Sequence, residues 1–185
     1  MIFTKIMVGW TGTTGWEKRD NYKEMEMRRI KLTQNKFALV DDDMFDYLNK
    51  WKWYANKLGN AWYAQRKSKL KNGKWKTLFM HRIVLRKTTK DLVLDHINHN
   101  GLDNQRANLR EATHQQNLFN RKSNINSTSK YKGVSLDRHR NKWLTQISVD
   151  GKHKYLGRFD DEVEAAKTYD EAAKKYFKHY ACLNF

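Results

Sequence analysis

The chain has 185 residues, 39% of them hydrophobic and 13% aromatic, so it can bury a core as one domain or as two small ones. Its 37 Lys and Arg against 20 Asp and Glu give a net charge of +17, which favours a polyanionic partner, most commonly nucleic acid. There is no apolar run long enough to span a membrane and no signal-peptide cleavage pattern, and the single cysteine, Cys182, excludes an intrachain disulfide and a cysteine-based zinc site.

The first 50 residues predict a short β-structure behind an uncertain arm. Residues 1–29 are either an arm lying on DNA or an incidental lead-in, and residues 22–29 suggest a short basic helix. Residues 30–33 alternate and residues 37–40 are apolar, which indicates two strands around a turn. Residues 41–49 predict a helix that begins with aspartates.

An aromatic and basic segment follows. Residues 51–55 and 61–66 are typical of strands, and five lysines surround an Asn72-Gly73 hairpin turn between residues 67 and 76. We expect the tryptophans here to form core, because a small β-domain needs aromatic bulk. Residues 77–85 are apolar and carry His81-Arg82.

A distinctive motif occupies residues 92–121. An apolar run ends in Asp95-His96, and a polar, glycine-containing loop leads to Asn108. Residues 113–121 then predict a helix, because Thr113 and Gln116 have capping-box spacing. The local pattern is strand, loop, strand, helix.

These residue types suit phosphodiester hydrolysis, which needs a base for water, a Lewis acid for phosphate oxygens and stabilisation of the leaving oxygen. A neutral histidine supplies the base, and a cation on a carboxylate supplies the rest. Successive strand residues point to opposite faces, so Asp95 and His96 act together only if the chain bends between them. Taken alone, the pair is also compatible with a simple charge pairing.

The motif resembles the HNH nucleases, whose ββα unit wraps around one metal ion. Asn108 and Asn117 follow His96 by 12 and 21 residues, and these intervals are similar to those of phage intron-encoded homing endonucleases. The resemblance covers residues 30–121. It implies that His96 is the general base, that Asp95 and Asn117 hold Mg²⁺ (or Mn²⁺), and that Asn108 fixes the loop bearing His96.

The implied ligand set carries one formal negative charge. Hard cations prefer several oxygens and more charge, so we expect weak metal binding until a DNA phosphate completes the shell. His99 and His114 are rival metal ligands. His99 lies in the loop, and His114 comes one helical turn before Asn117, the position that the resemblance implies. His81 is expected to be buried behind the site.

Residues 122–129 are polar and predict a linker to a second domain. Residues 131–136, 142–149 and 152–156 predict three strands, the last two joined by an Asp150-Gly151 turn. A helix over residues 161–177 presents an alanine- and tyrosine-rich stripe that should cover the face of Trp143 and Ile147. The opposite face is left exposed and basic, a shape that fits a major groove.

Residues 130–185 resemble an AP2 domain, through segments such as Tyr131-Lys132-Gly133-Val134, residues 155–160 and residues 164–170. The resemblance implies DNA contact through the open sheet face. The implied DNA-binding residues are Lys132, Ser135, Arg138, Arg140, Lys142, Gln146, Ser148, His153 and Tyr155. Several family positions that are Arg or Trp differ here, so the target of plant members should not be transferred.

We therefore predict an α+β protein with four parts: an arm (1–29), a β-rich region with the ββα-metal nuclease (30–121), a linker (122–129) and the AP2-like domain (130–185). The predicted function is a site-specific, metal-dependent endonuclease of homing type, acting as a monomer on double-stranded DNA in the cytoplasm of a bacterial or phage-infected cell. Two alternatives are a non-cleaving regulator built on a decayed nuclease and a nuclease without sequence choice. The residues leave the number of strands cut open.

Overall fold

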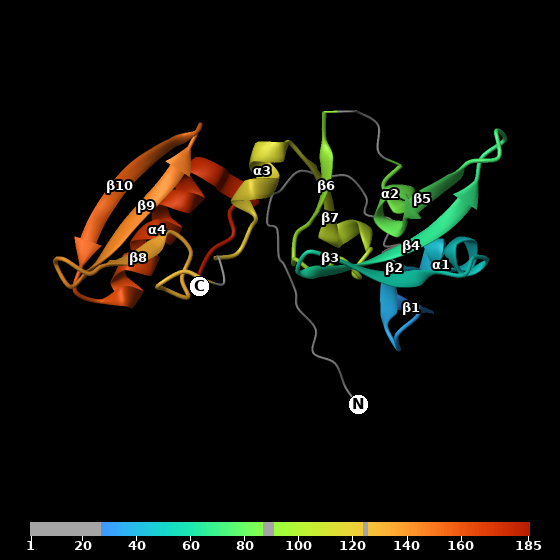
Figure 1. Ribbon diagram of the computed structural model, residues 1–185, viewed down its shortest axis with the longest axis horizontal. Helices are drawn as coiled ribbons and strands as arrows, with labels where there is room; N and C mark the ends of the chain where they lie inside the picture. The colour runs from blue at the N-terminus through green and yellow to red at the C-terminus, as the bar shows by residue number, and fades with distance from the viewer. Residues whose placement is uncertain (1–26, 87–90, 124–125) are drawn as a thin grey trace, which may run out of the picture.

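The computed structural model describes residues 27–86, 91–123 and 126–185. It is a mixed α+β structure with two two-stranded and two three-stranded antiparallel sheets, which confirms the predicted fold class. No helix in the described ranges is long and apolar enough to cross a membrane. In Figure 1 the yellow helix α3 (His114–Phe119) lies between the orange-red C-terminal domain and the green and blue N-terminal region.

The N-terminal region is built from two small sheets around one core. The first sheet pairs two strands, and the second has the order β3-β4-β5. The bounds are β1 Met27–Lys31, β2 Phe37–Asp41, α1 Asp42–Asn49, β3 Tyr54–Leu58, β4 Ala61–Lys69, β5 Trp75–Phe79 and α2 Met80–Val84. Buried Ile30, Val40, Leu48, Trp53 and Met80 lie in the core, which reaches Leu109 of the nuclease motif.

Two expectations for this region are wrong. Met27 to Arg29, predicted as the end of a basic helix, lie in strand β1, where Arg28 pairs with Val40 across the sheet. Cross-strand pairing overrides the local helical pattern there. The rest of that predicted helix, residues 22–26, lies outside the described ranges. The tryptophans do not all form core, because Trp53 is buried whereas Trp51 and Trp75 are 44% and 65% exposed.

The nuclease motif folds as predicted, as two strands followed by a helix. Its elements are β6 Val93–His96, η1 Arg106–Asn108, β7 Leu109–Ala112 and α3 His114–Phe119. Thr113 caps α3 through a capping box with Gln116. The long loop between the strands docks on β2, where the Leu39 amide donates to Leu102 and the Asn104 amide donates to Leu39, both at 2.8 Å.

The C-terminal domain is a three-stranded sheet covered by one helix. Its elements are β8 Val134–Asp137, β9 Lys142–Val149, β10 Lys152–Phe159, α4 Glu162–Phe177 and η2 Lys178–Tyr180. Thr145 and Ile147 of β9 are buried under Ala165, Ala166 and Tyr169 of α4, whereas Gln146 and Ser148 face outward. The helix therefore covers the predicted face and leaves the other face open.

Gly133 is the tightest point of this packing. It has a φ of +77°, and a Cβ built there would lie 1.9 Å from a Tyr169 ring carbon. Only glycine accepts both the left-handed backbone and this approach of α4. The first strand of the sheet is thereby held close against the helix.

Candidate nuclease site and nucleic-acid interface

A cleft of about 1050 Å³ opens where the N-terminal sheet, the nuclease motif and the start of the linker meet. Three of the four predicted nuclease residues line it: Asp95 and His96 at the end of β6, and Asn117 from α3. The chain bends after His96, because the next amide, of Ile97, bonds to the Asn108 carbonyl at 2.9 Å. The structure thus brings Asp95, His96 and Asn117 to one cavity.

Asp95 is buried and held by two side chains that the sequence did not single out. The Arg110 Nε donates to Asp95 Oδ2 at 2.9 Å, and its Nη2 lies 2.8 Å from the same oxygen. The Asn120 Nδ2 lies 3.1 and 3.0 Å from Oδ1 and Oδ2, and it also donates to the His96 carbonyl at 3.1 Å. The guanidinium therefore engages Oδ2, and Oδ1 meets only the amide of Asn120 among the described residues.

His96 is buried, at 6% exposure, beneath two other aromatic rings. Its ring centroid lies 5.8 Å from that of Tyr63 and 5.1 Å from that of His81. Burial lowers the pKa of His96 below its usual value, and the Asn104 side chain and the Asp95 and Asp103 carboxylates act in the opposite direction. The imidazole is accordingly neutral at physiological pH.

The two nitrogens of the His96 ring are not equivalent. Nε2 is closed to water and has no well-aligned hydrogen bond within the described ranges, and the same holds for the buried Oδ1 of Asn104. The Asn104 side chain nevertheless acts to raise the pKa of the imidazole, against the effect of burial.

Asn108, the fourth predicted residue, holds the loop and does not line the cleft. Its Oδ1 accepts from the Asn98 amide at 2.9 Å, and its Nδ2 donates to the Asp103 carbonyl at 2.9 Å. These two bonds join the start and the end of the loop that follows His96. The position suits the loop-fixing role that the family resemblance implied.

The rival histidines lie in different surroundings. His99 lines the cleft, with a φ of +64°, and its Nε2 lies 3.5 Å from Cys182 Sγ. His114 is exposed at the start of α3 and does not line the cleft. His81 is buried, and burial lowers its pKa to about 3, with His96 and Arg82 adding to the effect.

The oxygen donors of the cleft suit a divalent cation only in part. No group of three or more His, Cys, Asp or Glu that could hold a metal gathers in the part of the chain described. Two side chains of the cleft carry ligand oxygens instead: Asp95, whose Oδ1 accepts only from the Asn120 amide, and Asn117, whose side chain makes no hydrogen bond within that part of the chain. These oxygens fit a hard cation that takes its remaining ligands from phosphate and water.

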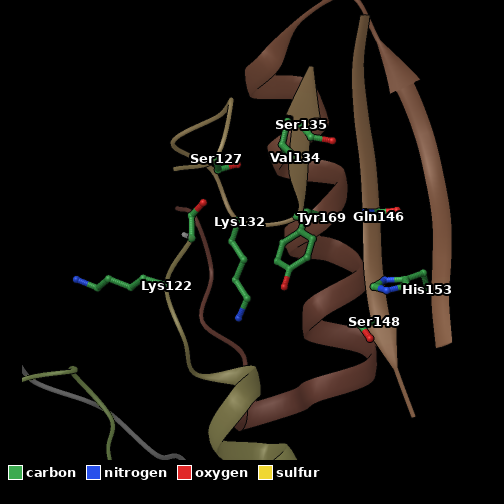
Figure 2. Close-up of a pocket in the computed structure, with 11 residues that line it drawn as sticks. Lys122, Ser127, Lys132, Val134, Ser135, Gln146, Ser148, His153 and Tyr169 are labelled. Atoms are coloured by element: carbon green, nitrogen blue, oxygen red, sulfur yellow. The ribbon is translucent and has the colours of Figure 1, made fainter. Parts of the chain in front are cut away.

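The second candidate surface is the open face of the C-terminal sheet. Gln146 pairs with Tyr155 and Ser148 with His153 across β9 and β10, so the four side chains share one face. A shallow hollow of about 390 Å³ lies beside them (Figure 2). Five of the predicted DNA-binding residues line this hollow: Lys132, Ser135, Gln146, Ser148 and His153.

Three of the predicted cationic contacts are already engaged within the protein. The ammonium of Lys132 donates to the Phe119 carbonyl of α3, and burial lowers its pKa. Lys142 bonds to Asp160 at 3.1 Å. Arg140 bonds to Asp137, which also holds Arg158 at 3.0 Å. Arg138, by contrast, is exposed at the β8–β9 turn.

A third basic surface is the β4–β5 hairpin. Tyr63, Lys67 and Lys69 alternate along β4 onto one face, and Trp75 sits opposite Lys69 on β5. Tyr63 lines the cleft, so the hairpin face continues outward from the candidate nuclease site. Residues 66–76 contain six Lys and Arg and no acidic residue.

A ββα unit with a histidine and a carboxylate in its cleft, joined to a sheet-and-helix domain with an open polar face, defines a DNA-acting nuclease class. Two family models match: HNH endonuclease over residues 79–119 and AP2 domain over residues 129–179. An uncharacterized HNH endonuclease of Acanthamoeba polyphaga mimivirus is 31% identical over 150 residues, covering 80% of this chain and 74% of the relative. The chain belongs to the HNH endonuclease family and carries a C-terminal AP2 domain.

The AP2 domain has plant relatives. The AP2-like ethylene-responsive transcription factor TOE2 of Arabidopsis thaliana and APETALA2-like protein 2 of Oryza sativa are each 41% identical over 58 residues. The match covers 31% of this chain but only 12% and 13% of those proteins. The similarity is therefore confined to the C-terminal domain.

Proposed function

We propose that the protein is a site-specific, metal-dependent DNA endonuclease of homing type, encoded within an intron. The observation that carries the proposal is His96, a buried and neutral histidine in one cleft with Asp95 and Asn117. A neutral imidazole is the form that accepts a proton from water. The dedicated AP2 domain supports site choice over indiscriminate cutting.

His96 acts in this proposal as the general base, and its neutral imidazole receives a proton from the attacking water. Asn108 fixes the loop that carries the ring. Asp95 and Asn117 would hold Mg²⁺ or Mn²⁺, which when bound polarises the phosphate and stabilises the leaving oxygen. With one carboxylate in the set, the protein binds the cation well only when DNA phosphate is present.

Double-stranded DNA is held on two sides of the cleft in this account. The AP2 sheet face reads bases, and Lys67 and Lys69 of the hairpin contact phosphates beyond the cleft. Strands rise about 3.3 Å per residue, so Lys69 reaches roughly 20 Å from Tyr63, the span of about six nucleotides of one strand. A monomer has one such site, which predicts a nick in one strand.

The test separates binding from cutting. A duplex is selected from a random pool by binding to the protein, and it is then used with wild-type protein, His96→Ala and the control His114→Ala. We expect His96→Ala to lose cleavage by about 10²-fold or more while its Kd for the duplex stays within about twofold. His114→Ala should match the wild type in both measurements. Equal loss of binding and cutting in His96→Ala would show that the histidine is only structural.

A non-cleaving regulator is the second candidate, and Arg110 is the observation that favours it. The Asp95 carboxylate is already neutralised by this guanidinium at 2.8 Å, as in a site that has no need of a cation. A protein that binds the selected duplex tightly and leaves it intact with Mg²⁺ and with Mn²⁺ would establish that alternative.

A further inference from the structure

The AP2 domain packs against the nuclease unit just after its helix α4, before Asn184 returns to Asp170 of that helix. After α4, the chain turns through η2 and returns to β7 and α3 as an extended segment. Phe177 stacks on Phe119 of α3, with ring centroids 3.8 Å apart and an interplanar angle of 11°. The Cys182 amide donates to the Phe119 carbonyl at 3.3 Å, and the Tyr180 hydroxyl donates to the Glu111 carbonyl at 3.0 Å. We call residues 177–182 the docking segment.

One guanidinium lies between this docking segment and the nuclease site. The Arg110 Nη1 donates to the His179 carbonyl, and its Cζ lies 4.6 Å from the centre of the Tyr180 ring. The same side chain donates through Nε to Asp95 and is only 13% exposed. A planar guanidinium has five N–H donors in a fixed arrangement, so contacts at one edge orient the other edge.

The contacts of Arg110 with the docking segment determine which carboxylate oxygen of Asp95 the guanidinium engages. The docking segment attracts the guanidinium through the His179 carbonyl and through the aromatic face of Tyr180. Arg110 in turn engages Oδ2, and Oδ1 accepts only from the Asn120 amide among the described residues. Without the docking segment, the guanidinium could shift towards both carboxylate oxygens or turn towards DNA phosphate, and either movement would compete with a cation at Asp95.

We propose that the docking segment is a positioning element of the nuclease site, acting on Asp95 through Arg110. This inference rests on the proposed function, since it concerns how the cutting site is assembled. On this proposal the AP2 domain contributes to DNA cleavage as well as to DNA binding. Deleting residues 130–185 is then expected to abolish cutting even when DNA is saturating.

The experiment uses full-length protein with Tyr180→Ala, which removes the ring beneath Arg110. Residues that orient a metal ligand typically change metal affinity or activity by 10–100-fold. We therefore expect the single-turnover rate at saturating duplex to fall by about tenfold or more, and the Mg²⁺ concentration for half-maximal rate to rise, while the Kd for DNA stays within about twofold. A segment that merely joins the two domains would leave the Mg²⁺ requirement unchanged.

Three further variants keep the outcome unambiguous. Tyr176→Ala is the matched control, because this tyrosine lies on α4 and contacts Lys154, away from the nuclease unit. It should cut at the wild-type rate. Tyr180→Phe keeps the ring and loses only the bond to Glu111, so it should remain close to wild type. Arg110→Lys keeps the charge but loses the planar guanidinium with its several donors. It should show the same slower cleavage and higher Mg²⁺ requirement as Tyr180→Ala.

The possible failures are distinguishable. A wild-type protein that does not cut overturns the proposed function. A wild-type protein that cuts, with Tyr180→Ala cutting equally fast at the same Mg²⁺ concentration, overturns the positioning role alone. If Tyr180→Ala does not fold, as judged by circular dichroism, Arg110→Lys decides the question by the same two readouts.

Discussion

The nuclease cleft and the open face of the AP2 sheet both face DNA in this account, yet they hold their functional side chains differently. Asp95 and Asn108 are buried, and each is fixed by hydrogen bonds from neighbouring elements. The side chains of Gln146 and Ser148 are exposed and make no hydrogen bond within the described ranges. A cutting site must be arranged before DNA arrives, whereas a reading face gains its partners from the DNA itself.

The largest effect is expected where a fixed side chain is removed from the loop that carries His96. Asn108→Ala leaves the Asp103 carbonyl without its buried partner, at a cost of about 1–3 kcal/mol, and it also removes the part-buried bond from the Asn98 amide. We expect a lower melting temperature and a cleavage rate reduced by about 10–100-fold. Asn100→Ala, in an exposed part of the same loop, is the matched control. Equal losses in the two variants would contradict the loop-fixing role of Asn108.

An intermediate effect is expected from acid acting on the buried histidine behind the site. The pKa of His81 is lowered to about 3, below the usual value near 6.5. Because the folded pKa is lower than the unfolded one, the contribution of His81 to stability is complete above about pH 6.5 and is lost as the pH falls towards 3. Urea unfolding at several pH values should therefore show a weaker acid dependence for His81→Phe than for wild type. Parallel curves would show that His81 does not titrate in this way.

The smallest effect is expected on the exposed basic hairpin. Each phosphate contact contributes about −0.9 to the slope of log K against log salt concentration, so Lys67→Gln with Lys69→Gln should reduce that slope by up to about 2. The cleavage rate at saturating DNA should not change. Lys174→Gln, already paired with Glu171 at 2.8 Å, serves as the control and should leave the slope unaltered. A hairpin variant with the wild-type slope would place the hairpin away from DNA.

Much of this comparison was predictable from the sequence. Alternation along β9, the Asp150-Gly151 turn and the alanine stripe of α4 are local patterns, and they fixed which sheet face is covered. The capping box at Thr113 and the spacing of Asn108 and Asn117 from His96 placed the nuclease motif in the same way. Local patterns such as these need no knowledge of distant contacts.

The missed residues depend on tertiary contacts. Arg110 and Asn120 contact Asp95 only because β7 and α3 fold against it. Asn104 reaches the site only because the loop docks on β2. Nothing local marks residues 177–182 as a segment that packs on the nuclease unit. The exposed Trp75 was missed for a related reason, since its position depends on how far the hairpin extends beyond the core.

Cleavage of the selected duplex under single-turnover conditions, with Mg²⁺ or with EDTA, tests the account most directly. A charge-neutral imidazole beside one carboxylate and an amide predicts a nick in one strand that needs Mg²⁺, with little Mg²⁺ bound by the free protein in calorimetry. An intact duplex in the presence of Mg²⁺ and Mn²⁺, or equal cutting in EDTA, would contradict it.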